Sequence, residues 1–401
     1  MQKKEKKEFI ITYKLLYTFL ILTVYLIGKN MPLYGIDLAQ YLHQTVDAQG
    51  LLLQTISGDI YRCSIFALGI SPYMISSMLM QVINAIRGSE YRAKQSPKKM
   101  NQHILGLTLI FAIVQAVLQV RNLLFKVTGA ELLLAQAVAG IEMVTGVMVI
   151  LWLSERNKKY GIGGQTALIF VNILDGIRAT LAGADADSMA VPLIMSLVVM
   201  MVVLLMENAE FRIPLQRISI HNIYADKNYL AIKLNPIGVM PAMFSTAFFM
   251  VPQLLITALN WMFPENEAIL WWQHNMTMTE PLGMVVYIVI LYCLTFGFSR
   301  VFVNPRELTE QFLKSGDSIE DIRAGKDTKR YLSKVITRIS LFSAAVMSVC
   351  LGMPLWLQFK GNIDNVLVTL PSSIMMMTGI WCNLYREMVA IKEMDDYKPF
   401  I

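Results

Sequence analysis

Two six-residue segments of this chain repeat one motif, in which proline and methionine follow glycine at the same spacing (G-x-x-P-x-M). They occupy residues 69–74 and 238–243, each within an apolar segment long enough to cross a membrane. Proline removes a backbone donor and kinks or breaks a helix, while glycine permits bending and close backbone approach. The expected breaks are at Gly69, Pro72, Gly238 and Pro241.

The chemistry that this pattern predicts is a seal that opens and closes, without covalent bonds being made or broken. Broken helices persist in a membrane only where neighbours or a water-filled cavity satisfy the freed backbone groups. Methionine is flexible and polarizable, so Met74 and Met243 suit an apolar gate that deforms around a variable object. Interrupted spans at matching places in two halves indicate an inverted repeat with a central pathway.

Motifs for covalent catalysis and metal binding are missing from the sequence. It contains no G-x-x-x-x-G-K-[ST] phosphate loop, no G-x-S-x-G elbow and no H-E-x-x-H helix. Its four cysteines and four histidines are scattered without the spacing of a disulfide framework or a metal site. We therefore expect no enzyme activity, no cofactor and no metal. The glycine-rich residues 161–164 are interpreted as a tight turn.

Charged residues inside the apolar segments are few. Glu142 lies midway along one such segment, while Asp175 and Arg178 are three residues apart and can pair. An ion-coupled transporter usually needs intramembrane acids as its ion or proton site. This leaves an ion-coupled small-solute transporter as a less favoured alternative to a channel.

The elements that position these residues are apolar helices. The chain is 55% hydrophobic and 16% charged, against about 25% charged residues in soluble domains. A membrane span needs about 20 apolar residues. The sequence predicts an all-α membrane protein with ten spans, at 15–29, 64–86, 104–124, 133–153, 162–181, 190–206, 237–258, 281–303, 335–354 and 366–385. These form two pseudo-symmetric inverted halves, 1–181 and 190–401, around a central pore.

Most of the 35 lysines and arginines lie on one side of the predicted spans. The positive-inside rule then places both chain ends and the two longest loops, 207–236 and 304–334, in the cytosol. Long loops between packed helices tend to be functional. The basic face either attracts anionic lipid or serves as a docking surface.

Four long stretches match a known family in order: residues 31–37 (MPLYGID), 64–81 (SIFALGISPYMISSMLMQ), 144–170 and 303–325. With them the chain resembles the SecY family, the central channel of the bacterial protein translocase, over nearly its whole length. The resemblance implies a passive channel made of two five-helix halves clasped around an hourglass pore. This pore opens across the membrane for secreted chains and sideways for apolar segments.

The resemblance also implies roles for individual residues. The implied constriction ring consists of Ile70, Met74, Phe170, Leu174, Met243 and Met376. The implied plug of the outer funnel spans about 51–62 and includes Leu52, Leu53, Ile56, Ser57, Gly58 and Ile60. The implied motor-docking residues are Arg323, Lys326, Arg306, Arg212 and Arg217.

Departures from the family pattern fall in its cytosolic loops. The family usually has proline where Ala324 stands, and GIGNGIS where residues 161–167 read GIGGQTA. This pattern resembles the accessory SecY paralogue of some Gram-positive bacteria, which exports serine-rich glycosylated adhesins with its own SecA-like motor. The alternative is a divergent housekeeping SecY for general secretion and membrane insertion. Both imply the bacterial plasma membrane, and as partners a SecA-type ATPase, small SecE-like and SecG-like subunits, secretory preprotein and lipid, with no nucleic acid.

Overall fold

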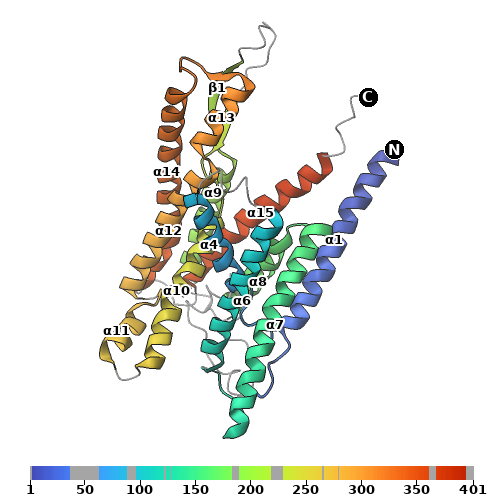
Figure 1. The fold of residues 1–401 in the computed structure, drawn as a ribbon, viewed down its shortest axis with the longest axis vertical. Coiled ribbons are helices and arrows are strands. Elements are labelled where there is room, and N and C mark those ends of the chain that lie inside the picture. The colour runs from blue at the N-terminus through green and yellow to red at the C-terminus, as the bar shows by residue number, and fades with distance from the viewer. Residues whose placement is uncertain are drawn as a thin grey trace.

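The protein is a long bundle of helices in the computed structural model (Figure 1). The structure describes residues 2–36, 63–87, 96–121, 123–127, 129–182, 189–217, 229–263, 266–278, 280–360 and 367–393. The predicted plug, with Leu52, Leu53, Ile56, Ser57, Gly58 and Ile60, lies outside the described residues.

Each of the ten predicted spans falls on a helix. These helices are α1 (Gln2–Lys29), α4 (Ser71–Arg87), α6 (Pro97–Arg121), α7 (Ala130–Tyr160), α8 (Gly164–Ala182), α9 (Ala190–Asn208), α10 (Met240–Met262), α12 (Pro281–Phe302), α14 (Lys326–Phe359) and α15 (Thr369–Glu393). Among the described residues, seven helices are long and apolar enough to cross a membrane, namely α1, α6, α7, α9, α10, α12 and α14. The molecule is therefore a multi-span membrane protein.

The helices form two groups that meet along two seams. In the first group, α7 contacts α1, α6 and α8, and α4 contacts α6; in the second, α12 contacts α10 and α14, and α15 contacts α9 and α14. One seam joins α4 and α6 to α10, and the other joins α8 and α1 to α15. Figure 1 shows α1, α6, α7 and α8 on the right and α10, α12 and α14 on the left.

The two long loops contain regular structure that the sequence did not reveal. They provide a three-stranded antiparallel sheet of order β2-β1-β3, with β1 at Glu210–Arg217, β2 at Tyr229–Lys233 and β3 at Asp317–Ile319. Helix α13 (Pro305–Ser315) packs on α14 beside this sheet. The fold is thus largely helical with a small sheet. Strands of three to eight residues are too short for a clear alternating pattern, so the sequence did not predict them.

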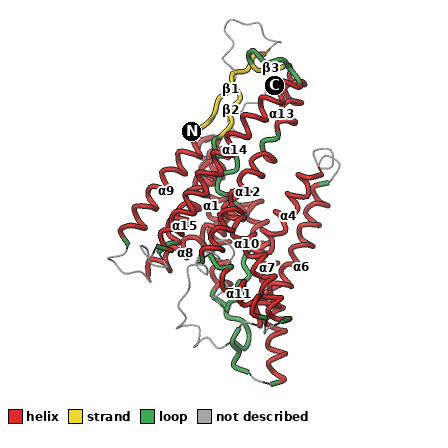
Figure 2. The backbone as a smooth tube through the Cα atoms, turned by 90° about the vertical axis from the view of Figure 1, so that its left-hand side faces the viewer, coloured by secondary structure: helices red, strands yellow, loops and turns green. Residues whose placement is uncertain are grey.

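We call β1, β2, β3, α13 and the first turns of α14 the projecting unit. Its core contains Ile213, Ile232, Phe312, Ile319, Leu332 and Ile336, all buried. The projecting unit lies at the upper end of the molecule in Figures 1 and 2. A short helix, α11 (Glu267–Asn275), lies in the lower part of both views.

Candidate functional site

The two G-x-x-P-x-M motifs adopt the same local geometry. Gly69 and Gly238 have φ of 54° and 70°, the left-handed region that glycine enters without a steric penalty. Two residues later α4 begins at Ser71 and α10 begins at Met240. Both motifs are therefore breaks at the start of a helix, not kinks within one.

The prolines are accommodated by these starts. Pro72 and Pro241 each stand second in their helix, where the missing backbone N–H has no intrahelical partner to lose. The helix of the second predicted span, 64–86, begins later than predicted, at Ser71, because the first residues of that span form the turn that ends at Gly69.

The motifs also share a backbone hydrogen bond of the first turn. Met74 N donates to Ile70 O at 3.0 Å, and Met243 N donates to Val239 O at 3.3 Å. Each methionine therefore occupies the same position in its own helix. The two helices contact each other, and Ser71 Oγ donates to Met250 Sδ at 3.6 Å across the seam.

Five of the six predicted ring residues belong to one apolar cluster, which we call the constriction cluster. Met74 and Met376 are 2% exposed, and Phe170 packs against the cluster while remaining half-buried. Leu174, one turn beyond Phe170 on α8, is 42% exposed and is not among its members. The members from the predicted ring are Ile70, Met74, Met243, Met376 and Phe170. Their role as a ring stays a prediction.

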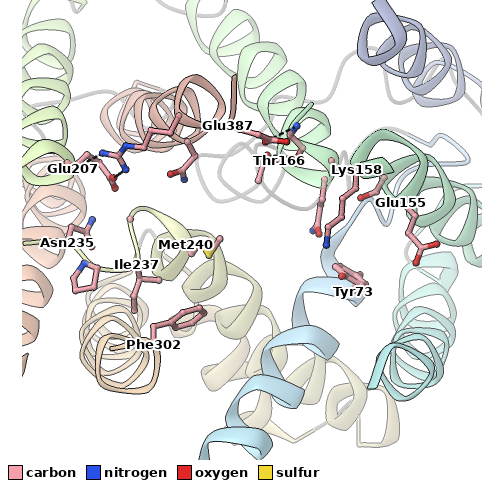
Figure 3. Close-up of a pocket in the computed structure, with 18 of the residues that line it drawn as sticks. Tyr73, Glu155, Lys158, Thr166, Glu207, Asn235, Ile237, Met240, Phe302 and Glu387 are labelled. Carbon is pink, nitrogen blue, oxygen red and sulfur yellow. Dashed lines mark hydrogen bonds and ion pairs between the residues drawn. The ribbon is translucent and has the colours of Figure 1, made fainter. Parts of the chain in front are cut away.

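A polar cavity of about 840 Å³ lies between the two helix groups, and we call it the vestibule. Figure 3 shows Tyr73, Lys158 and Glu155 on one wall and Glu207 and Asn235 on the other. Charges of both signs line it, since Lys158, Lys159, Lys233 and Arg386 accompany Glu155, Glu207 and Glu387.

Three helices run directly from the vestibule into the constriction cluster. On α4, Tyr73 lines the vestibule and the next residue, Met74, is in the cluster; on α10, Met240 lines the vestibule one turn before Met243. On α8, Thr166 precedes Phe170 by one turn. A cavity lined by polar and charged residues thus leads directly to a buried apolar cluster.

A buried ion pair holds one wall of the vestibule together. Arg386 Nη1 of α15 lies 3.0 Å from Glu207 Oε2 of α9, and Arg386 Nη2 also donates to the carbonyl oxygen of Glu207. Glu207 is 2% exposed and Arg386 is 34% exposed. A Cβ on Gly238 would lie 2.8 Å from Glu207 Oε1, so the pair also abuts the turn that starts α10.

The opposite wall is closed by the turn between α7 and α8, which confirms the interpretation of residues 161–164 as a tight turn. Asn157 Nδ2 donates to the carbonyl oxygens of Ile162 and Gly164, both at 3.0 Å. Gly163 N donates to Glu387 Oε2 at 3.1 Å, which links this turn to α15.

Acidic groups in the spans serve as structural partners. Asp175 pairs with Arg178 at 3.2 Å, as the spacing predicted, and with the buried Lys29 of α1 at 2.7 Å, which it did not. Glu142 Oε2 accepts from the backbone N–H of Tyr34 at 3.0 Å. Because these carboxylates already have protein partners, they give little support to the transporter alternative.

All five predicted docking residues belong to the projecting unit or its edges. Arg306 is the second residue of α13, Arg323 precedes α14 and Lys326 begins it, and these three side chains are exposed. Arg212 lies over the ring of Tyr229, 4.6 Å from its centroid. Arg217 is the last residue of β1. The sheet thus joins two loops that are about 100 residues apart in sequence and brings these basic residues into one unit.

Sequence reasoning missed Glu207 and Arg386 as site residues. Glu207 follows the apolar run of α9 directly, which makes it look like the first residue of a solvent-exposed loop. The available signal was its place inside the last turn of a long apolar helix, in the sequence LLMEN.

Comparisons with known proteins agree with this architecture. The family model named SecY matches residues 64–385. The accessory Sec system protein translocase subunit SecY2 of Leuconostoc gelidum subsp. gasicomitatum is 28% identical, over 96% of this chain and 95% of that protein. The subunit of the same description from Staphylococcus aureus (strain Newman) is also 28% identical, over 99% and 98% of the two chains.

Solved structures share the fold at low identity. A protein-conducting channel superposes with a TM-score of 0.65 at 18% identity, covering 95% of this chain and 93% of that one. Sec61 in the canine ribosome–channel complex from the endoplasmic reticulum superposes with a TM-score of 0.62 at 17% identity, covering 95% and 93%. These similarities establish the fold.

Proposed function

Because this chain belongs to the SecY family, we propose that it is the polypeptide-conducting channel of an accessory Sec translocase in a bacterial plasma membrane. The observation that carries the proposal is the polar vestibule that ends at the constriction cluster, with Met74 and Met243 at equivalent positions of two facing helices. The channel is passive: it lowers the cost of moving polar backbone through hydrocarbon, which is several kcal/mol per unsatisfied group.

The proposed topology has ten spans in two inverted halves, residues 1–181 and 190–401. Its support is the helix found at each predicted span and the shared geometry of the two motifs. Both chain ends and the projecting unit face the cytosol in this topology, in agreement with the concentration of lysine and arginine there. The vestibule then opens toward the cytosol, where a preprotein arrives.

The proposed gate is the seam between α4 and α10. The first turns of α4 and α10 line the vestibule or belong to the constriction cluster. Moving these two helices apart would therefore open the apolar seal and, at the same time, a sideways exit into the lipid. An unladen ring of Ile70, Met74, Phe170, Leu174, Met243 and Met376 excludes water, and a chain in transit displaces its flexible methionines. The plug at about 51–62 is proposed to cover the outer side.

The proposed partner of the projecting unit is a SecA-type motor, which supplies the energy of transport. We further propose that small SecE-like and SecG-like subunits bind the channel and that its cargo is serine-rich glycosylated adhesins. Its support is the named function of the relatives, accessory Sec translocase subunits, and the exposed Arg306, Arg323 and Lys326 on one unit.

The deciding experiment measures ATP hydrolysis by the accessory and the housekeeping motor with proteoliposomes of this channel. We expect stimulation of the accessory motor only, and its loss in Arg323→Glu. Lys314→Glu is the matched control, since Lys314 is an exposed base on α13 of the same unit and undergoes the same charge reversal. Stimulation of the housekeeping motor alone would instead assign the chain to general secretion, and equal loss in both variants would refute the specific docking role of Arg323.

A further inference from the structure

The lower end of α10 and the following helix α11 present a dense group of exposed aromatic and apolar side chains. The chain has six tryptophans, and Trp261, Trp271 and Trp272 fall within twelve residues of each other. These three side chains are 46–59% exposed, and neighbouring Met262 and Phe263 are 63% and 55% exposed. We call these five residues the aromatic end. Such a group on a soluble surface would be an exposed apolar patch that requires a partner.

Helix α11 and its last turn are joined to α10 by two hydrogen bonds. Asn260 Nδ2 donates to Gln273 Oε1 at 2.7 Å, and Gln253 Nε2 donates to the carbonyl oxygen of Met276 at 3.0 Å. Asn266 caps α11, because its side chain accepts from the backbone N–H of Ala268 at 3.1 Å. No residue of α11 is buried, so the helix packs its polar Gln273 on α10 and leaves its tryptophans outward.

The chain connections fix α11 at the depth of a membrane surface. It follows α10 and precedes α12, and both of these helices are candidate spans. Four residues separate Met262 from Glu267, a reach of no more than about 15–18 Å including the flanking bonds. Helix α11 therefore cannot lie far from the level where α10 leaves the hydrocarbon.

The composition of α11 selects that level. Glu267, Gln273 and His274 are too polar for the hydrocarbon centre, where an ionised side chain costs several kcal/mol. The tryptophans favour the boundary because an indole ring has an apolar body and a single N–H donor, and such rings gather at headgroup level. Arg121 lies over the ring of Trp261, 3.9 Å from its centroid, so a cation at the end of α6 shares this layer.

We propose that the aromatic end is an interfacial anchor that seats the lower end of α10 among the lipid headgroups. The occupant of this surface is the bilayer itself, since the apolar flank continues along α10 through the exposed Leu255 and Leu259 into the lipid-facing side of the span. That these headgroups belong to the outer leaflet of the membrane rests on the proposed function. The depth of the anchor, at headgroup level, does not depend on it. Anchored in this way, α10 has a fixed outer end about which its upper end, at Met243, swings.

The test is depth-dependent quenching of tryptophan fluorescence in liposomes of phosphatidylcholine and phosphatidylglycerol. A variant with Trp152, Trp261, Trp356 and Trp381 changed to Phe retains only the α11 pair. The matched control changes all six tryptophans to Phe and adds Val289→Trp, at an exposed position well inside α12. Lipids brominated near the headgroup end or near the end of the acyl chains, and iodide in the water, are the quenchers. Elution as a single species in detergent confirms that each variant is folded.

For the α11 pair we expect at least about twofold stronger quenching by the shallow bromine than by the deep one, because an interfacial helix lies about 5–10 Å into the headgroup and acyl boundary. The Val289→Trp control should show the opposite order. Strong iodide quenching without lipid quenching would place α11 in water and overturn the proposal. Protection from all three quenchers would mean that protein, such as a second copy, covers the aromatic end, and would overturn it equally. Neither result depends on a motor, so loss of the proposed function would leave this measurement unchanged.

Discussion

Removing Arg386 should destabilise the channel more than altering its partner, although both residues form one ion pair. Glu207 is 2% exposed, so Arg386→Met leaves an uncompensated carboxylate with almost no access to water. Breaking a buried pair in this manner costs about 3–5 kcal/mol. Since Arg386 is itself 34% exposed, water can reach part of the site, and we expect a loss near the lower limit, about 3 kcal/mol.

The converse change should be milder. Glu207→Gln keeps a side-chain oxygen that accepts from Arg386, and the arginine left without a counter-charge is one-third exposed to solvent. Replacing the charged acceptor of one hydrogen bond by a neutral one costs about 1–2 kcal/mol. The double change Glu207→Leu with Arg386→Met should cost less than Arg386→Met alone, because no unpaired charge remains buried.

The assay is equilibrium unfolding in mixed micelles of increasing denaturing detergent, followed by intrinsic fluorescence. It compares the wild type, Glu207→Gln, Arg386→Met, Glu207→Leu and the double variant, so that Glu207→Leu and Arg386→Met form a closed cycle. A double-mutant cycle isolates the pair only if each single change adds no new contact. The reasoning would be refuted if Glu207→Gln cost as much free energy of unfolding as Arg386→Met. Equal costs would mean that water already solvates the carboxylate, and that the pair does not hold α9, α15 and the start of α10 together.

Three further predictions address the seal, the turn and the projecting unit. Met74→Asn or Met243→Asn places an amide in the dry cluster at about 1–3 kcal/mol, so ion current through the idle channel in planar bilayers should rise, and an unchanged current would contradict the seal. An alanine in the left-handed region costs about 1–2 kcal/mol, and Gly129→Ala, whose Cβ would meet open space, should cost only that strain. Gly238→Ala should lower stability by more, because its Cβ would also lie too close to Glu207. Equal shifts in melting temperature for the two variants would mean that the contact with Glu207 adds no cost. Phe312→Ala, at a side chain 8% exposed, should lower the free energy of unfolding of the projecting unit by about 3–5 kcal/mol. It should abolish stimulation of the motor without raising the ion current of the idle channel. Retained stimulation would contradict the docking proposal.

Features that depend on local composition could be predicted from the sequence. The helices, the tight turn at residues 161–164 and the equivalence of the two motifs follow from hydropathy, glycine and proline, and the structure has each of them. The pairing of Asp175 with Arg178 follows from their spacing on one helix face. These signals are local, so a single sequence carries them.

Features that join distant segments could not be predicted in the same way. Glu207 and Arg386 are 179 residues apart, and Lys29 and Asp175 are 146 residues apart. The sheet that joins two loops uses a three-residue strand, β3, which has no periodicity to detect. Leu174 follows Phe170 by one turn, is 42% exposed and is not among the members of the constriction cluster, and its place in the ring stays a prediction.

The two seams between the helix groups differ in the interactions that cross them, and this difference bears on the proposed gate. Across the seam of α8 and α15, Gly163 N donates to Glu387 Oε2 at 3.1 Å near one end, and Thr180 and Thr369 share a hydrogen bond of 3.3 Å between hydroxyl oxygens near the other. Directional bonds at both ends of a helix pair resist separation, and breaking the buried Thr180–Thr369 bond would leave hydroxyl groups unpaired in the interior.

The seam of α4 and α10 is crossed by softer contacts. Ser71 Oγ meets a methionine sulfur at 3.6 Å, a weak acceptor, and the Arg121 guanidinium meets the face of Trp261 at 3.9 Å from its centroid. The hydrogen bond of Ser71 to a thioether sulfur is weaker than the hydrogen bonds of the other seam, which end on a carboxylate and a hydroxyl oxygen. Among the described residues, the contacts that cross the two seams therefore support the proposed gate at α4 and α10, because the hydrogen bonds between α8 and α15 are the costlier ones to break.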